Sequence, residues 1–260
     1  MTKKTCSDDI AFYSLEKLGY QVDIIPASDK KEADFIVKYK DNIALVEAKL
    51  KEDSDETIEN RVADLSTKRV SIVDSKLGRN ETYSGIIRSA SKQLSSSDKQ
   101  HDFKVLLFTV SGINTESKKD QLKDTIYGST LIIEGNKSKV CYFFRNSDFY
   151  RRTNIDAIII GVWDIQSKQI YFELCLNPYA KNYQLLKVSN FIEPFGQAII
   201  DPIELERKGL AYIPDCDIER NLTELQKLSP MYNPILQHLQ EKYKTGYLIN
   251  VDLNAPDIES

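Results

Sequence analysis

A nearly unbroken run of apolar residues, "FKVLLFTV" at residues 103–110, constrains the fold of this chain more than any other feature. The run has the length of a strand, and a strand without polar alternation must be covered on both of its faces. Helices usually provide that cover. We therefore expect this run to be the central strand of an α/β fold.

The segments before this run predict its neighbours. Residues 7–19 show apolar residues at helical spacing and end at a glycine, which indicates a helix. A short strand, "YQVDII", follows, and then two strands joined at the turn-prone "KDN". The segment "YSGIIRSASKQLSSS" predicts an amphipathic helix directly before the central strand. The order helix, three strands, helix, strand favours a mixed sheet flanked by helices.

The remaining segments are less regular. Residues 51–84 are polar and charged, with one weak helical pattern and a loop, and we expect an excursion from the core there. After residue 127 the chain is first strand-rich and then mostly helical and acidic. We divide it into a core at residues 1–135 and an extension at 136–260, packed on the core, that serves recognition, dimerisation or partner binding.

Composition excludes several classes of protein. The 260 residues are 41% hydrophobic, enough for a substantial core. No apolar stretch is long enough to span a membrane and the start lacks a signal-peptide pattern, so we expect a protein inside the cell with no membrane partner. The cysteines are far apart and form no CxxC pair, which argues against a disulfide framework or a zinc site. Phosphate-binding glycine loops are absent.

The formal net charge of -4 does not advertise nucleic-acid binding, although it hides a net basic segment at residues 61–110 and a net acidic one at 201–260. Within the basic segment, Arg88 and Lys92 are stacked four residues apart on one side of the second helix. They are candidates for phosphate contacts, as are Lys76 and Arg79, but exposed basic residues also simply solvate a surface.

The stretch "ADFIVKYKDNIALVEAKLK" places polar residues where the strands need apolar ones. Side chains alternate along a strand, so Glu47 and Lys49 project to the same side. With Asp41 and Asn42 as the turn, the pairing puts Asp34 directly across from Lys49 and diagonal to Glu47, about 5 to 8 Å apart at Cβ. A shift of one residue would separate these groups.

Two nearby carboxylates repel each other unless a cation lies between them. Mg²⁺ prefers oxygen ligands, and one or two carboxylates commonly hold it together with substrate phosphates. An adjacent lysine would orient an attacking water and balance charge on the phosphate. The group therefore predicts hydrolysis of phosphodiester bonds.

Asp34, followed twelve residues later by Glu47-Ala48-Lys49, resembles the PD-(D/E)xK nuclease superfamily. Restriction endonucleases, Holliday junction resolvases and many phage-defence nucleases belong to this superfamily. The order of elements up to residue 110 is similar to its restriction-endonuclease-like core. Ala33 stands where the family name has proline.

The resemblance implies roles for individual residues. Asp34 and Glu47 would be metal ligands, joined by the Ala48 carbonyl, and Lys49 would be the catalytic lysine. A first-helix acid, Asp8 with Asp9 as the alternative, would add to the metal site. In the second helix Gln93, with Lys92 as its neighbour, would face the site.

The expected function is that of a Mg²⁺-dependent endonuclease that cleaves DNA, with Mn²⁺ as a substitute. The resemblance implies a bacterial restriction or phage-defence system in the cytoplasm, with a homodimer or a defence partner protein as further options. Two alternatives stay open: a catalytically inactive scaffold of the same fold, and an RNase.

Overall fold

The computed structural model describes residues 6–26, 31–68, 71–76, 78–164, 169–251 and 254–259. Its helices are α1 (Cys6–Lys17), α2 (Asp55–Lys68), α3 (Glu81–Ser96), α4 (Thr115–Tyr127), α5 (Asp148–Arg151), α6 (Tyr183–Lys187), α7 (Pro202–Arg207), α8 (Glu224–Leu228) and α9 (Pro234–Tyr243), with 3₁₀ helices η1 (Asn190–Phe195) and η2 (Pro230–Tyr232). Its strands are β1 (Gln21–Ile24), β2 (Phe35–Tyr39), β3 (Asn42–Lys51), β4 (Ser71–Lys76), β5 (Phe103–Ser111), β6 (Thr130–Glu134), β7 (Lys137–Cys141), β8 (Ala157–Asp164), β9 (Gln169–Leu176), β10 (Ile199–Ile200), β11 (Ala211–Tyr212), β12 (Leu248–Val251) and β13 (Asn254–Glu259).

The main sheet of the described chain has seven strands in the order β1-β2-β3-β5-β8-β9-β10. Strand β5 lies inside this sheet and runs parallel to both β3 and β8, whereas β1, β2 and β3 pair antiparallel. The sheet is therefore mixed. The prediction of a central strand at residues 103–110 is confirmed, as is the α/β class.

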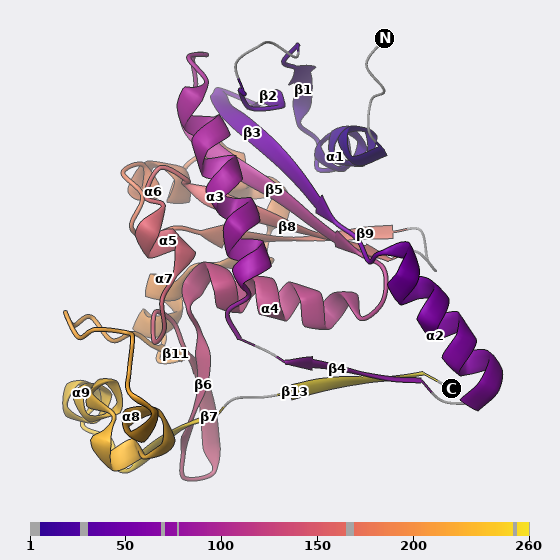
Figure 1. Ribbon diagram of the computed structural model, residues 1–260. Coiled ribbons are helices and arrows are strands. Elements are labelled where there is room, and N and C mark those ends of the chain that lie inside the picture. Colours follow the sequence, from indigo (N-terminus) through magenta and orange to yellow (C-terminus); the bar gives the residue numbers. More distant parts are fainter. Residues whose placement is uncertain are drawn as a thin grey trace.

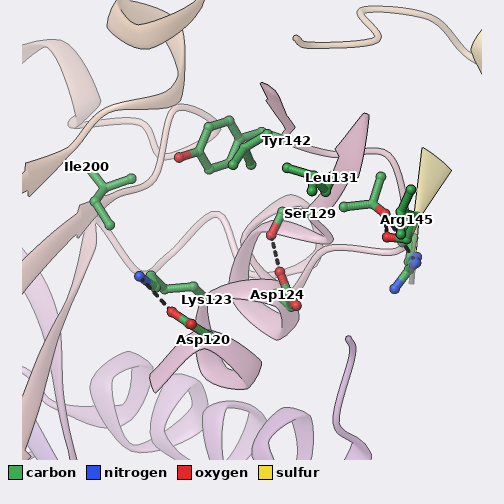
Figure 2. Close-up of a pocket in the computed structure, with 11 residues that line it drawn as sticks. Asp120, Lys123, Asp124, Ser129, Leu131, Tyr142, Arg145 and Ile200 are labelled. Atoms are coloured by element: carbon green, nitrogen blue, oxygen red, sulfur yellow. Dashed lines mark hydrogen bonds and ion pairs between the residues drawn. The ribbon is translucent and has the colours of Figure 1, made fainter. Parts of the chain in front are cut away.

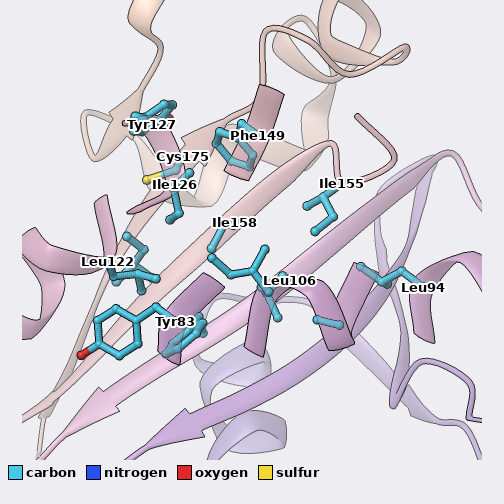
Figure 3. Packing of buried hydrophobic residues seen from close by; sticks show 14 of the residues in the cluster. Tyr83, Leu94, Leu106, Leu122, Ile126, Tyr127, Phe149, Ile155, Ile158 and Cys175 are labelled. Atoms are coloured by element: carbon cyan, nitrogen blue, oxygen red, sulfur yellow. The ribbon is translucent and has the colours of Figure 1, made fainter. Parts of the chain in front are cut away.

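Helices cover both faces of the sheet (Figure 1). On one face, α3, α4 and α5 pack on residues such as Leu106 and Ile158, and Figure 3 shows these side chains interlocked. On the other face, α1, α6 and η1 pack on Val46, Val105 and Leu107. An unalternating apolar strand is stable here because neither of its faces meets water.

The boundary expected between residues 135 and 136 falls in the turn of the β6–β7 hairpin. Strands β8, β9 and β10, from the expected extension, belong to the same sheet as β1, β2 and β3. The sheet therefore does not divide at that position. A smaller sheet, β11-β7-β6-β12, packs against α9 through a separate apolar cluster.

The polar segment after β3 is more ordered than expected. The segment contains α2, where the sequence shows a weak helical pattern. It also contains β4, which overlaps the part of the segment that we expected to be a loop. Strand β4 pairs antiparallel with β13 from the far end of the chain, and Figure 1 shows this ribbon below α4. Among the described residues no helix is long and apolar enough to cross a membrane.

A clamp holds the carboxyl ends of β3 and β5 together. Asp53, just after β3, accepts a hydrogen bond from the Ile113 N–H at 2.7 Å and pairs with the Lys118 ammonium at 2.6 Å. Lys118 also donates to the Ser111 carbonyl at 2.8 Å. Gly112 has φ of +94°, and a Cβ there would lie 2.3 Å from Asp53 Oδ2. The clamp therefore requires glycine at this position.

We predict that Gly112→Ala lowers the free energy of unfolding by about 2 to 4 kcal/mol, through positive-φ strain plus displacement of the Asp53 carboxylate. Gly135→Ala is the matched control, because Gly135 has φ of +59° but open space around it. Strain alone should cost that variant about 1 to 2 kcal/mol. Chemical denaturation measures both values, and equal losses would contradict the clamp.

Candidate active site

Asp34, Glu47 and Lys49 meet at the open end of the β2–β3 hairpin. The observed register pairs Phe35 with Val46 and Tyr39 with Asn42, so the turn residues are Lys40 and Asp41. The predicted pairing of Asp34 with Lys49 is wrong by two residues. Because side chains alternate with a period of two, this shift leaves Glu47 and Lys49 on the expected face and brings Asp34 beside Glu47.

The turn explains the shifted register. Lys40, the first turn residue, has φ of 51°, a left-handed conformation that usually favours glycine, asparagine or aspartate. Its ammonium forms an ion pair with Glu193 of η1. A contact with a distant segment thus accompanies a turn that local propensity does not predict.

Hydrogen bonds fix the position of Asp34. Its N–H donates to the Val46 carbonyl at 3.1 Å, and its Oδ2 accepts from the Ala48 N–H at 2.8 Å. The N–H and C=O groups of one strand residue point to the same side. The Ala48 carbonyl therefore also points toward the β2 side.

Glu47 is fully buried, although it is an acid. Lys49, with 27% of its side chain exposed, forms an ion pair with Glu47 Oε1. The other carboxylate oxygen, Oε2, is buried without any hydrogen-bond partner in the described structure. An unpaired buried carboxylate oxygen is costly, so the site as folded lacks a positive group or a donor at that point.

Burial raises the pKa of Glu47 to about 8, and the neighbouring Asp34 carboxylate adds to the rise while Lys49 opposes it. Burial also raises the pKa of Asp34, against the lowering effects of the Ala48 N–H and of Lys49. The two carboxyl groups are close enough for a protonated one to hydrogen-bond to the other, so Glu47 Oε2 is without a partner when both groups are ionised. Both shifts disfavour two negative charges in this space, and a cation would reverse both.

Asp8 lies in the first turn of α1. It is half-buried, and its charge raises the pKa of Asp34, so it is within electrostatic reach of the site. Asp9 is exposed. Among the described residues no three histidine, cysteine, aspartate or glutamate side chains are grouped closely enough to hold a metal on their own. Asp34 and Glu47 therefore provide a two-carboxylate site, with Asp8 outside it.

Gln93 lies on α3, the helix that covers the site face of the sheet. The flank of α3 bearing Ser84 and Ser91 contacts Asp148 and Asn154. Ser97, at the end of α3, accepts a hydrogen bond from the Ala33 N–H at 2.7 Å. Gln93 lies one helical turn before Ser97, on the same side of α3. Its amide oxygen accepts from Ser89 at 3.4 Å, and the described structure shows no hydrogen bond from Gln93 to Asp34 or Glu47.

A groove of about 580 Å³ follows the outer side of α3. Three of its lining residues are basic, and the other four are small or polar: Lys31, Arg88 and Lys92, with Gly85, Ser89, Gln93 and Ser96. Ser96 donates to the Lys31 carbonyl, which ties one end of the groove to the segment that leads into Asp34. The sequence alone gave no reason to place Lys31 here, because that link runs between distant segments.

A second cavity, of about 260 Å³, lies between α4 and the β6–β7 hairpin (Figure 2). Its polar side chains are largely paired with one another. Lys123 pairs with Asp120 at 3.0 Å, and Ser129 donates to Asp124. A site with its polar groups already satisfied is a weaker candidate for catalysis than one with an unpaired buried carboxylate.

Comparisons with known proteins do not identify this chain. No family model, no curated protein and no solved structure matches it. The geometry of the site is therefore the basis for a functional proposal.

We predict that the metal-free protein loses stability as the pH rises from about 4.5 to 8. In this interval the folded state, with its raised Glu47 pKa, holds a proton that the unfolded state releases. The loss should amount to a few kcal/mol at most, since one pKa unit corresponds to about 1.4 kcal/mol. Glu47→Gln should remove most of this pH dependence.

Thermal and chemical denaturation across this pH range test the prediction. Glu241→Gln, which removes an exposed carboxylate, serves as the control and should behave like the parent. An identical pH dependence in the parent and in Glu47→Gln would show that Glu47 is not the titrating group.

Proposed function

We propose that this protein is a metal-dependent nuclease that hydrolyses phosphodiester bonds in DNA. The observation that carries the proposal is the buried Glu47 carboxylate, which has one oxygen paired with Lys49 and the other without a partner beside Asp34. A buried carboxylate with one unpaired oxygen beside a second acid destabilises a core, whereas it suits a site that binds a cation and a phosphate.

The residues present fit a divalent cation. Asp34, Glu47 and the Ala48 carbonyl offer hard oxygen ligands. The unpaired Oε2 of Glu47 is available to coordinate a cation. Mg²⁺ bound here would supply charge neutralisation and polarisation of a phosphoryl oxygen. Mg²⁺ keeps several waters and takes substrate phosphates as ligands, so a site with two carboxylates is sufficient.

Lys49 is the group that faces both carboxylates and solvent. Hydrolysis adds water across a P–O ester bond and leaves a phosphate monoester and a hydroxyl group. The ammonium of Lys49 would orient the attacking water by hydrogen bonding and stabilise the negative charge that develops on the phosphate. Its pairing with Glu47 keeps the ammonium at this position before substrate binds.

The arrangement of the elements supports this proposal. Helix α1, strands β1 to β3, helix α3 and strand β5 follow in the order that the PD-(D/E)xK resemblance implies, with α2 and β4 inserted before α3. The sheet order β1-β2-β3-β5, with β3 and β5 parallel, accompanies that order. The proposed setting, a bacterial restriction or phage-defence system, rests on the resemblance alone.

We predict that the protein nicks or linearises supercoiled plasmid only with Mg²⁺ or Mn²⁺. Asp34→Ala and Lys49→Ala should each lower the rate by about 100-fold or more, because each removes a group that acts on the reacting phosphate. Lys38→Ala is the control, since Lys38 belongs to the same hairpin but pairs with Asp23. Undiminished activity in Asp34→Ala or Lys49→Ala would remove the proposed site.

The same assay separates the alternatives. Matched DNA and RNA oligonucleotides show which nucleic acid is the substrate, and preferred cleavage of RNA would identify an RNase. An inactive scaffold would bind DNA without any metal-dependent cleavage, and its two carboxylates would show no Mn²⁺ binding by calorimetry.

We predict that the groove along α3 binds phosphates of the DNA backbone. The double variant Arg88→Ala/Lys92→Ala should weaken binding to a cleavage-resistant duplex and reduce the slope of log K against log salt by about 2, roughly one unit per lost phosphate contact. Arg207→Ala/Lys208→Ala removes the same charge from the end of α7 and the residue that follows it, and should leave the slope unchanged. Equal effects of the two double variants would refute a specific groove.

A further inference from the structure

A small pocket outside the candidate active site is lined by several basic side chains and by no acidic one among the described residues. It encloses about 230 Å³ between the start of α3 and the segment that carries α8 and α9. Four cationic side chains line it, those of Arg79, Arg145, Arg220 and Lys227. No aspartate or glutamate is among its described lining residues. Arginine and lysine side chains only donate hydrogen bonds, so the lining is rich in donors.

Asn233 adds a buried donor without a partner. This lining residue is 1% exposed, and its Oδ1 caps α9 by accepting from the N–H groups of Ile235 and Leu236 at 3.0 and 3.2 Å. These two bonds fix which end of the amide is oxygen. The Nδ2 group is consequently a donor, and it is buried without a hydrogen-bond partner in the described structure. A buried donor of this kind requires an acceptor that the folded chain does not supply.

Two of the guanidinium groups are held in place before any ligand binds. Arg220 donates hydrogen bonds to four main-chain carbonyls, those of residues 143, 214, 216 and 218. These partners orient the group without neutralising its charge. Arg79 is fixed by ion pairs with the buried Asp148 at 2.8 Å and with Glu81 at 3.0 Å, and it donates to Ser84 at 2.7 Å. The two carboxylates compensate its charge, so Arg79 holds its place in the lining without adding net charge to it. Preorganised donors bind an anion without the entropy loss of ordering them.

From these observations we infer that the pocket is a binding site for a phosphate group, carried by a small phosphorylated ligand. The tetrahedral oxygens of phosphate accept hydrogen bonds from several directions, which suits a lining that contains guanidinium groups and an amide. Phe144 and Leu222 also line the pocket, and they offer apolar surface to a short organic portion. The cavity of Figure 2 differs, because Asp120 and Asp124 line it.

This site is independent of the proposed nuclease activity, since none of the residues discussed here belongs to the two-carboxylate site. Direct binding to the full chain therefore tests it. The probes are inorganic phosphate, adenosine 5′-monophosphate and a 5′-phosphorylated oligonucleotide, measured by calorimetry in chloride of matched ionic strength without divalent metal. Saturable binding of at least one probe is expected. If the nucleotide binds more tightly than phosphate, the pocket also contacts the organic portion of its ligand. If the oligonucleotide binds most tightly, the ligand is the phosphorylated end of a nucleic-acid strand.

Asn233→Asp is the decisive variant. Aspartate caps a helix as well as asparagine does, so α9 should stay folded, while the buried Nδ2 donor of this lining residue is replaced by a carboxylate oxygen. We expect affinity for the probes to fall by about tenfold or more, since hydrogen bonds to charged groups are among the strong ones. Lys227→Ala, which removes an exposed lining cation, should weaken binding less.

Asn114→Asp is the matched control. Asn114 caps α4 through its side-chain oxygen, as Asn233 caps α9, but it does not line the pocket. The variant Asn114→Asp therefore carries the same substitution and the same change in net charge at a position away from the pocket. Its affinity for the probes should equal that of the parent. Absence of saturable binding of all three probes would overturn the inference. So would an affinity in Asn233→Asp equal to that in Asn114→Asp.

Discussion

The parallel pairing of β3 with β5 is the constraint on which the rest of the structure depends. Parallel neighbours require a crossover connection, and the chain supplies it through α2, β4 and α3. Because the crossover returns over one face of the sheet, α3 packs on Leu45 and Leu106 of that face, together with α4 and α5. The opposite face is covered by α1, α6 and η1. Both strands are thereby removed from water.

This pairing also creates the unusual chemistry at Glu47. The register places Glu47 beside Leu106 of β5, in a part of the sheet where an aliphatic side chain would be the stabilising choice. Lys49 compensates only one oxygen of the buried carboxylate. Asp34, fixed by the Ala48 N–H, increases the repulsion. Local conflict of this kind, inside an otherwise consistent core, is typical of functional sites.

Helix α3 connects the two proposed sites. Its end is tied to the segment before β2 by the bond between Ser97 and Ala33, close to the carboxylates. Its beginning is tied through Arg79 to the buried Asp148 of α5. Arg79 also lines the basic pocket beside the small C-terminal sheet. One rigid helix thus borders both the main sheet and the segment that completes the pocket.

Much of the core could be predicted from local patterns. The apolar run of β5, the periodicity of α1 and α3, and the common side of Glu47 and Lys49 depend only on side-chain spacing within each element. These features were therefore readable without any knowledge of neighbours. The PD-(D/E)xK-like spacing of Asp34, Glu47 and Lys49 is of the same local kind.

Only the tertiary structure decided the features that depend on distant partners. The hairpin register follows a left-handed Lys40 that pairs with Glu193, and β4 is a strand because β13 lies beside it. The membership of β8, β9 and β10 in the main sheet, the complete burial of Glu47 and the unpaired Nδ2 of Asn233 have the same origin. Side-chain periodicity is a property of one segment, whereas register, burial and hydrogen-bond satisfaction are set by what that segment packs against.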